Sequence, residues 1–237
     1  MRICNRCILP ETFPNVKFDA DGVCNHCRQD EPALAESSAK KAEYRQKLDD
    51  LISATRDRAP AYDAVMAYSG GKDSSYTLKL LKERYGLRII AFTLDNHFVP
   101  PVTWDNIRTV VDGLGVDHMT LRPSWSLMKE LFTVTAREDI FSPATLLRAS
   151  SMCTACISIV KGLALKTALE MSIPLVAFGW SPGQAPIQSA IMKTNPSLIR
   201  QNQKVLKAAL PPNVLSSMAP YILPITYYDL YKDVFPY

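Results

Sequence analysis

The fold of this chain is decided by the stretch Ala64-Val65-Met66-Ala67-Tyr68-Ser69-Gly70-Gly71-Lys72-Asp73-Ser74. Its first five residues form a short apolar run, which predicts a buried strand. From Ser74 to Arg84 the apolar residues recur at helical spacing, and Gly86 then marks the end of the helix. The stretch therefore predicts a strand, a glycine-rich loop and a helix, which in an open α/β sheet form a common binding site for phosphate.

The loop between this strand and helix has the composition of an anion site. Two glycines allow a tight turn that no Cβ obstructs, and successive backbone N–H groups can then surround an anion. Serine hydroxyls add donors and a lysine adds positive charge. The spacing is not that of a Walker A loop, and a plain Gly-Gly turn is the alternative interpretation. The predicted phosphate-binding residues are Ser69, Gly70, Gly71, Lys72, Asp73 and Ser74.

Strands and helices are predicted to alternate along the rest of the chain. The predicted strands cover 64–68, 88–94, 117–121 and 174–178. The predicted helices cover 33–58, 74–84, 102–114, 126–137, 157–171 and 197–210. Alternation of this kind is typical of a parallel α/β sheet with right-handed crossovers. We expect a head at 1–31, a helical linker at 32–60 and the α/β domain at 61–237.

Composition and charge restrict the class of protein. The chain has 237 residues, of which 47% are hydrophobic, enough for one domain and a small appendage. A net charge of +4 suits a polyanionic substrate such as a nucleotide, but it does not by itself indicate nucleic-acid binding. No apolar run approaches the length of about 20 residues needed to span a bilayer, so no membrane span is predicted. The N-terminus has no signal-like segment, so a cytoplasmic location is expected.

The first 27 residues contain two Cys-x-x-Cys pairs separated by 16 residues. This spacing predicts one structural zinc ion held by four thiolates, which leave no open coordination position. So short a head cannot bury much apolar surface, and the metal would stabilise it. Unligated thiols, an iron–sulfur cluster and replacement of one cysteine by His26 are the alternatives. The predicted ligands are Cys4, Cys7, Cys24 and Cys27.

A third pair, Cys153 and Cys156, opens a predicted helix. A helix N-terminus lowers the pKa of a thiol and favours the thiolate. The pair is therefore a candidate for redox or persulfide chemistry, or for holding a metal or a 4Fe–4S cluster. A cluster would need a further ligand, since the sequence has no seventh cysteine. The alternative is two structural cysteines in the core.

The loop resembles the signature Ser-Gly-Gly-x-Asp-Ser of the PP-loop ATP pyrophosphatase superfamily. The resemblance implies a Rossmann-like domain that converts ATP to AMP and pyrophosphate through an adenylate of the substrate. It further implies catalytic roles for Lys72 and Asp73, with Asp73 helping to place Mg²⁺. Asp95, after the second strand, would contact the adenosine, and Gly179, after the last strand, would face the α-phosphate. An acidic residue after a strand is also a common turn residue.

Further motifs narrow the resemblance to the N-acetyl sugar amidotransferase family. They are Cys4-Asn5-Arg6-Cys7-Ile8-Leu9-Pro10, Phe18-Asp19, Gly22-Val23-Cys24-Asn25-His26-Cys27, Leu114-Gly115-Val116-Asp117-His118, Cys153-x-x-Cys156, and Ile173-Pro174-Leu175 leading to Gly179. The resemblance implies adenylation of an amide oxygen of an acetamido sugar in surface polysaccharide synthesis, followed by attack of ammonia. It implies a small-molecule acceptor such as a nucleotide sugar, and a separate glutaminase as ammonia source. Residues 179–186 would line the substrate pocket.

The same features are similar to those of the tRNA thiolation branch of the superfamily. That resemblance implies a sulfur donor, with Cys153 and Cys156 carrying sulfur or a cluster as catalytic residues. It leaves tRNA and a homodimer open as partners. A third class is a non-enzymatic zinc module for protein or nucleic acid, but Lys and Arg are few and scattered near the head. Such a module also leaves the loop at 69–74 unexplained.

Overall fold

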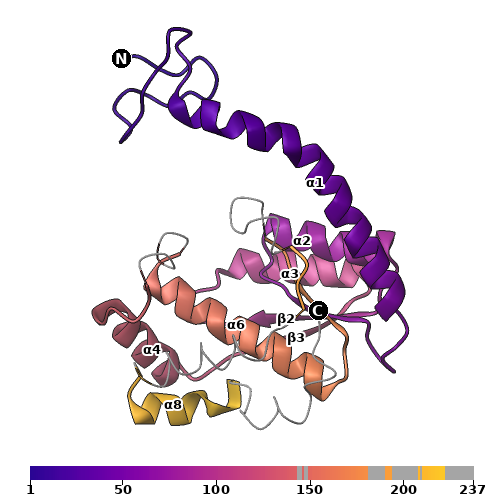
Figure 1. Cartoon of the computed structure of the whole chain (residues 1–237). Helices are drawn as coiled ribbons and strands as arrows, with labels where there is room; N and C mark the ends of the chain where they lie inside the picture. Colours follow the sequence, from indigo (N-terminus) through magenta and orange to yellow (C-terminus); the bar gives the residue numbers. More distant parts are fainter. Residues whose placement is uncertain (143–145, 147–148, 181–189, 194–207, 209, 222–237) are drawn as a thin grey trace. The chain divides into compact units, whose positions relative to one another are not determined.

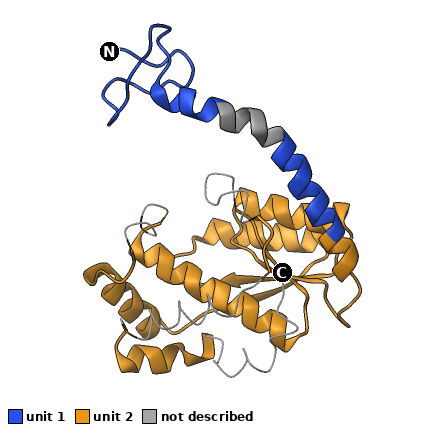
Figure 2. Cartoon of the chain, in the orientation of Figure 1, with its two compact units in different colours: residues 1–50 blue, residues 51–237 orange. Residues whose placement is uncertain are grey.

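The computed structural model describes residues 1–142, 146, 149–180, 190–193, 208 and 210–221, with 32–38 described through the backbone only. Contacts divide the chain into two compact units, Met1–Asp50 and Leu51–Tyr237, shown in Figure 2. The boundary falls inside helix α1, Asn25–Thr55. This helix begins earlier than the predicted 33, directly after Cys24. The predicted division of the chain at residues 31 and 60 stays a prediction.

The larger unit is built on a four-stranded parallel sheet, as the alternation of elements predicts. Its strands are β1 Ala64–Ala67, β2 Ile89–Leu94, β3 Asp117–Leu121 and β4 Leu175–Phe178, in the order β3-β2-β1-β4. β1 is buried on both sides because its neighbours are β2 and β4 and helices cover the sheet. The chain moves from β1 to β3 in one direction and then returns to place β4 on the other side of β1.

Helices cover both faces of this sheet, as Figure 1 shows. α2, Lys72–Lys79, continues as a π-helical turn, Leu80–Arg84, and lies with α3, Pro101–Leu114, on one side. The other side carries α4 Trp125–Arg137, α6 Ser151–Glu170, α8 Pro212–Met218 and the short 3₁₀ turn Ala219–Tyr221. Right-handed crossovers require this arrangement when the order of strands reverses direction.

Helix α6 is the central helix of its layer. It buries seven residues, among them Ile159, Leu163 and Ala164, and contacts β1, β4 and α4. Within the described residues it is also the one helix long and apolar enough to cross a membrane. It packs against strands of the sheet on one side and against α4 on another, as a core helix does. A helix with several buried faces needs apolar residues on each of them, which explains the high hydropathy of α6.

The amino ends of β1 and β2 are joined by an ion pair. Asp63 is 1% exposed, and its carboxylate accepts hydrogen bonds from Arg88 Nη2 at 2.7 Å, Arg88 N at 2.9 Å and Asp57 N at 2.9 Å. Burial would raise the pKa of Asp63, but the Arg88 side chain and these N–H groups lower it to about 2.

The predicted helix over 197–210 and residues 181–186 of the predicted substrate pocket fall outside the described residues, apart from isolated positions.

Candidate functional site

The loop after β1 turns sharply over helix α3. Gly70 has φ of +73°, which a residue with a side chain rarely adopts. A Cβ there would also lie 2.8 Å from Ile107 Cγ1 and from Thr103 Cγ2. Gly71 is the N-cap of α2 and provides no side-chain cap. The first N–H groups of α2 have no acceptor within the helix, so this end suits an anion.

The serine hydroxyls of the loop bond to one another. Ser74 Oγ donates to the Gly71 carbonyl at 3.0 Å and lies 3.0 Å from Ser69 Oγ. Since the Ser74 proton is used on Gly71, Ser69 is the donor of that second bond. Lys72 has a 91% exposed side chain whose Nζ lies 3.2 Å from Asp73 Oδ1. The loop is thus closed internally, while the charged groups of Lys72 and Asp73 remain accessible to a ligand.

Gly179 lies against the first turn of α2. A Cβ on Gly179 would be 2.4 Å from Ser74 Cα, 2.8 Å from Ser74 N and 3.0 Å from the Asp73 carbonyl oxygen. The contact arises because β4 pairs with β1 and Gly179 follows the register pair of Ala67 and Phe178. β1 and β4 flank the point where the strand order reverses, which is where open α/β sheets bind ligands. The structure therefore brings Gly179 to the loop at 69–74.

Asp95 lies at the same carboxyl edge of the sheet, directly after β2. Its Oδ1 accepts from His97 N at 2.9 Å and its Oδ2 lies 3.3 Å from Arg122 Nε, after β3. Asp95 thus stabilises the turn after β2 through the hydrogen bond from His97 N, and it also forms an ion pair with Arg122. A cavity of about 390 Å³ adjoins it, with Trp104, Arg108 and Arg122 in its lining. Arg122 was not predicted as a site residue, although it directly follows β3 as Asp95 follows β2, and this position could have indicated it.

A second set of bonded residues, near the end of β2, was not predicted. Thr93 Oγ1 donates to the Tyr68 carbonyl at 2.7 Å and lies 2.8 Å from His118 Nε2. Because the threonine proton is used on Tyr68, His118 Nε2 is the donor to Thr93. Burial lowers the pKa of His118, which favours the neutral ring with its proton on Nε2. These bonds link the Tyr68 carbonyl, which follows β1, with Thr93 of β2 and with His118 near the start of β3.

Cys153 and Cys156 lie in the first turns of α6, as predicted. Ser150 caps the helix, with Oγ accepting from Cys153 N at 3.3 Å. Cys153 is exposed, whereas Cys156 is partly buried and its Sγ lies 3.7 Å from Asn96 Nδ2. The expectation of a lowered thiol pKa is wrong for Cys156. Burial raises the pKa of this thiol, a shift that the Asn96 hydrogen bond opposes and the nearby Cys153 increases.

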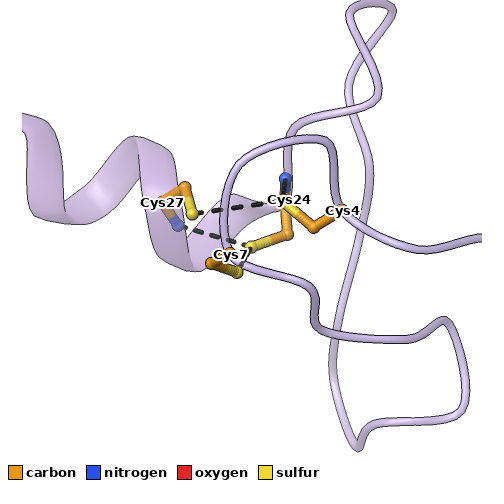
Figure 3. Close-up of side chains that lie close together, drawn as sticks. All are labelled: Cys4, Cys7, Cys24 and Cys27. Atoms are coloured by element: carbon orange, nitrogen blue, oxygen red, sulfur yellow. Dashed lines mark hydrogen bonds between the residues drawn. The ribbon is translucent and has the colours of Figure 1, made fainter.

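The four cysteines of the head converge on one point, shown in Figure 3. Their sulfur atoms all lie within 4.8 Å of one another, with Cys4 and Cys27 at 4.0 Å and Cys7 and Cys24 at 3.5 Å. Zinc–sulfur bonds of about 2.3 Å place tetrahedral thiolates about 3.8 Å apart. The head therefore fits a single four-coordinate ion. The four thiolates of a cubane cluster stand further apart than those of one ion.

Backbone N–H groups around the sulfur atoms support a metal centre. Burial raises the pKa of Cys4, but N–H groups of Arg6 and Cys24, at 3.4 and 3.2 Å from its sulfur, lower it to about 6. The pKa of Cys27 is raised to about 12 by the neighbouring thiol of Cys7 and by burial. Four thiolates held this close repel one another, and a bound metal cation would neutralise their negative charge. His26 lies outside this group, with its ring 6.2 Å from that of Phe13.

Among the described residues, the head is the one group of three or more His, Cys, Asp or Glu side chains arranged for a metal. Cys153 and Cys156 offer two sulfur atoms, and no third His, Cys, Asp or Glu side chain among the described residues joins them in such a group. The residues described around α6 therefore do not form the site that a cluster with three protein ligands needs. Thr154 Oγ1, between the two cysteines, is buried without a hydrogen-bond partner among the described residues.

Comparisons with known proteins give distant relatives. No protein-family model matches the chain. The uncharacterised protein MJ1599 of Methanocaldococcus jannaschii is 23% identical over 124 residues, 52% of this chain and 43% of that protein. An argininosuccinate synthase of Pelobacter propionicus is 35% identical over 68 residues, 27% of this chain and 17% of the enzyme. The chain thus spans less than half the length of these curated relatives.

Several solved structures are similar to the chain at low identity. The U34-tRNA thiolase NcsA of Methanococcus maripaludis, with its 4Fe–4S cluster, is 15% identical with a TM-score of 0.37, covering 86% of this chain and 59% of its own. The NH3-dependent NAD synthetase of Campylobacter jejuni is 12% identical with a TM-score of 0.43, covering 81% and 96%. The NMN synthetase of Francisella tularensis is 16% identical with a TM-score of 0.44, covering 81% and 83%.

The fold and the loop define a class. A parallel α/β sheet with the loop Ser69–Ser74 between its first strand and first helix is the arrangement that the resemblance to the PP-loop ATP pyrophosphatase superfamily implies. The loop lies beside the reversal of strand order, where that class would bind its nucleotide.

Proposed function

We propose that this chain is an ATP pyrophosphatase that joins AMP to an oxygen atom of an acceptor. The observation that carries the proposal is the approach of Gly179 to Ser74, which packs the end of β4 against the first turn of α2, a helix whose N-terminus has no side-chain cap. An anion bound there would meet the N–H groups of α2, and no Cβ from the end of β4 would obstruct the loop.

Each loop residue has a role in this proposal. The N–H groups and the Ser69 and Ser74 hydroxyls bind the pyrophosphate portion of ATP. Lys72 stabilises the negative charge of the leaving pyrophosphate, and Asp73 contributes a carboxylate to the Mg²⁺ that accompanies ATP. Asp95 and the cavity beside it receive the adenosine. The acceptor oxygen attacks the α-phosphorus, pyrophosphate leaves, and a nucleophile then displaces AMP from the acceptor carbon.

For the second half-reaction we propose amidotransfer to an N-acetyl sugar. The support is the set of head and inner motifs that resemble the N-acetyl sugar amidotransferase family. The amide oxygen of the acetamido group would take up AMP, and ammonia from a separate glutaminase would then add to the amide carbon and release AMP. The product would be an acetamidino sugar.

Sulfur transfer is the second candidate, and one specific observation favours it. The sulfur of Cys156 lies beside Asn96, the second residue after β2, at the edge of the sheet where the adenylate would form. A persulfide on Cys156, loaded by a separate sulfur donor, could attack the same activated carbon through its terminal sulfur and displace AMP. The Cys153 thiolate would then cleave the S–S bond, which releases the thiolated acceptor and leaves a disulfide between the two cysteines. The ATP half-reaction would be unchanged.

For the head we propose one zinc ion bound by Cys4, Cys7, Cys24 and Cys27. Four thiolates saturate the metal, so it stabilises the head and takes no part in the reaction. Sulfur distances of 3.5 and 4.0 Å support this assignment.

Product analysis tests the proposal. The full chain would be incubated with ATP, Mg²⁺, an N-acetyl nucleotide sugar and ammonium, and the nucleotides would be separated by chromatography. We expect AMP and pyrophosphate in equal amounts, and formation of ADP and phosphate would overturn the proposal. Replacing ammonium with sulfide distinguishes the two nucleophiles, because the sulfur reaction exchanges the acceptor oxygen for sulfur and the ammonia reaction exchanges it for nitrogen, so the two products differ in mass.

A further inference from the structure

Asn96 is held in one orientation by the backbone of its own turn. Its Oδ1 accepts a hydrogen bond from Phe98 N at 3.0 Å. Exchanging the oxygen and nitrogen of the amide would point NH₂ protons at the Phe98 N–H, which excludes the flipped arrangement. The amide nitrogen is therefore the atom left to face α6, where it lies 3.7 Å from Cys156 Sγ.

The two cysteines of α6 have different surroundings. Residues three apart on a helix lie on neighbouring parts of its surface but not on the same line. Cys153 is exposed, whereas Cys156 is partly buried and turned toward the end of β2. Asp95, the residue before Asn96, is the one proposed to contact the nucleotide. The contact between Asn96 and Cys156 thus connects the inner cysteine with the proposed active-site edge.

From this contact we infer that Asn96 is a positioning residue that holds the Cys156 sulfur at the carboxyl edge of the sheet, where sulfur transfer would need it. The inference rests on the sulfur-transfer candidate proposed above, because that candidate gives Cys156 its role. An amide N–H that donates to sulfur stabilises the thiolate over the thiol. This hydrogen bond opposes part of the effect of burial on the pKa of Cys156.

Alkylation of the full chain tests the inference without any substrate. The two sulfur atoms would be labelled with iodoacetamide between pH 6 and 10, and the labelled peptides quantified by mass spectrometry. Cys153 serves as an internal reference in every sample. The variants are Asn96→Asp, which keeps the acceptor to Phe98 N but replaces the donor with a negative charge, and Asn96→Ala. Asn106→Ala, on the exposed face of α3, is the matched control.

We expect Asn96→Asp to slow alkylation of Cys156 at pH 8 roughly tenfold, as one pKa unit requires. The pH midpoint for Cys156 should rise in both Asn96 variants, while the midpoint for Cys153 stays as in the control. A Cys156 midpoint unchanged in both Asn96 variants overturns the inference, as does an equal shift of both cysteines. Thermal unfolding identifies a variant that has lost its fold. Failure of the ATP reaction would leave this measurement intact, so the two proposals fail separately.

Discussion

Gly179 and Ser74 are in backbone contact: a Cβ added to Gly179 would lie 2.4 Å from Ser74 Cα. Ser74 is the last residue of the predicted phosphate-binding loop at 69–74, and Gly179 follows β4. A contact this close determines how near the loop lies to the end of β4, because neither backbone can move without displacing β4 or α2. The edge of the proposed nucleotide site therefore depends on a residue far from the loop in sequence.

The first prediction concerns this contact. Gly179→Ala should displace the first turn of α2, destabilise the protein by about 1–3 kcal/mol and lower ATP turnover more than this loss of stability explains. Thermal unfolding and AMP release measure the two effects. Gly113→Ala is the control, because a Cβ there meets nothing within 4 Å in helix α3. We expect that variant to keep its activity and gain about 0.5–1 kcal/mol. Equal activity of both variants would contradict the role of Gly179.

The second prediction concerns the exposed lysine of the loop. Lys72→Ala should reduce AMP formation about 100-fold or more, because it removes the positive charge proposed to stabilise the leaving pyrophosphate. Its stability should change little, since the side chain is 91% exposed. Lys79→Ala, on the same helix and paired with Glu83 at 3.7 Å, is the matched control and should keep its rate. A Lys72→Ala rate within twofold of that control would exclude the proposed role.

The third prediction concerns the metal of the head. Freshly purified protein should contain about one zinc per chain by elemental analysis, and Cys27→Ser should lose most of it because three thiolates bind zinc more weakly than four. Cys153→Ser is the matched control and should keep its zinc, because Cys153 is outside the four-cysteine group. Iron in place of zinc in the unmodified protein would refute the zinc assignment. Loss of zinc from the control would show that the metal lies elsewhere.

The fourth prediction concerns the pH dependence of stability. The pKa of Asp63 is lowered from 3.8 to about 2 in the folded protein, so its contribution is present above about pH 4 and is lost as the pH falls toward 2. Asp63→Asn should therefore lower the free energy of unfolding by about 2–3 kcal/mol at pH 7, where it leaves Arg88 without its buried partner. Urea unfolding should show that the difference from the unmodified protein narrows between pH 5 and pH 3.

A constant difference across that pH range would contradict the ion pair as its cause. Asp112→Asn provides the control, because this aspartate lies on the exposed face of α3. We expect less than about 0.5 kcal/mol from it at either pH.

Much of the larger unit could be predicted because its information is local. The apolar run at 64–68 and the helical spacing after Ser74 correspond to β1 and α2, and the loop lies between them as expected. The runs before Asp95 and Gly179 likewise correspond to β2 and β4. Strand and helix periods are properties of neighbouring residues, so a single sequence displays them.

The start of α1 and the raised pKa of Cys156 could not be predicted from local sequence patterns. α1 begins at Asn25, directly after Cys24, and the Cys24 sulfur accepts a hydrogen bond from Cys27 N in the first turn at 3.4 Å, as a helix-capping side chain does. The raised pKa of Cys156 comes from burial, which depends on the residues that surround α6 and not on its place at the helix N-terminus.

The sequence alone determined the loop at 69–74, the alternation of strands and helices, and the doubled cysteine pairs, because each of these depends on spacings of a few residues. The tertiary structure decided which strands are neighbours. By placing β4 beside β1 it brought Gly179 against Ser74, and by packing α6 against β1 and β4 it brought Cys156 to Asn96. Contacts of this kind depend on how the helices and strands pack, which no local pattern of residues specifies.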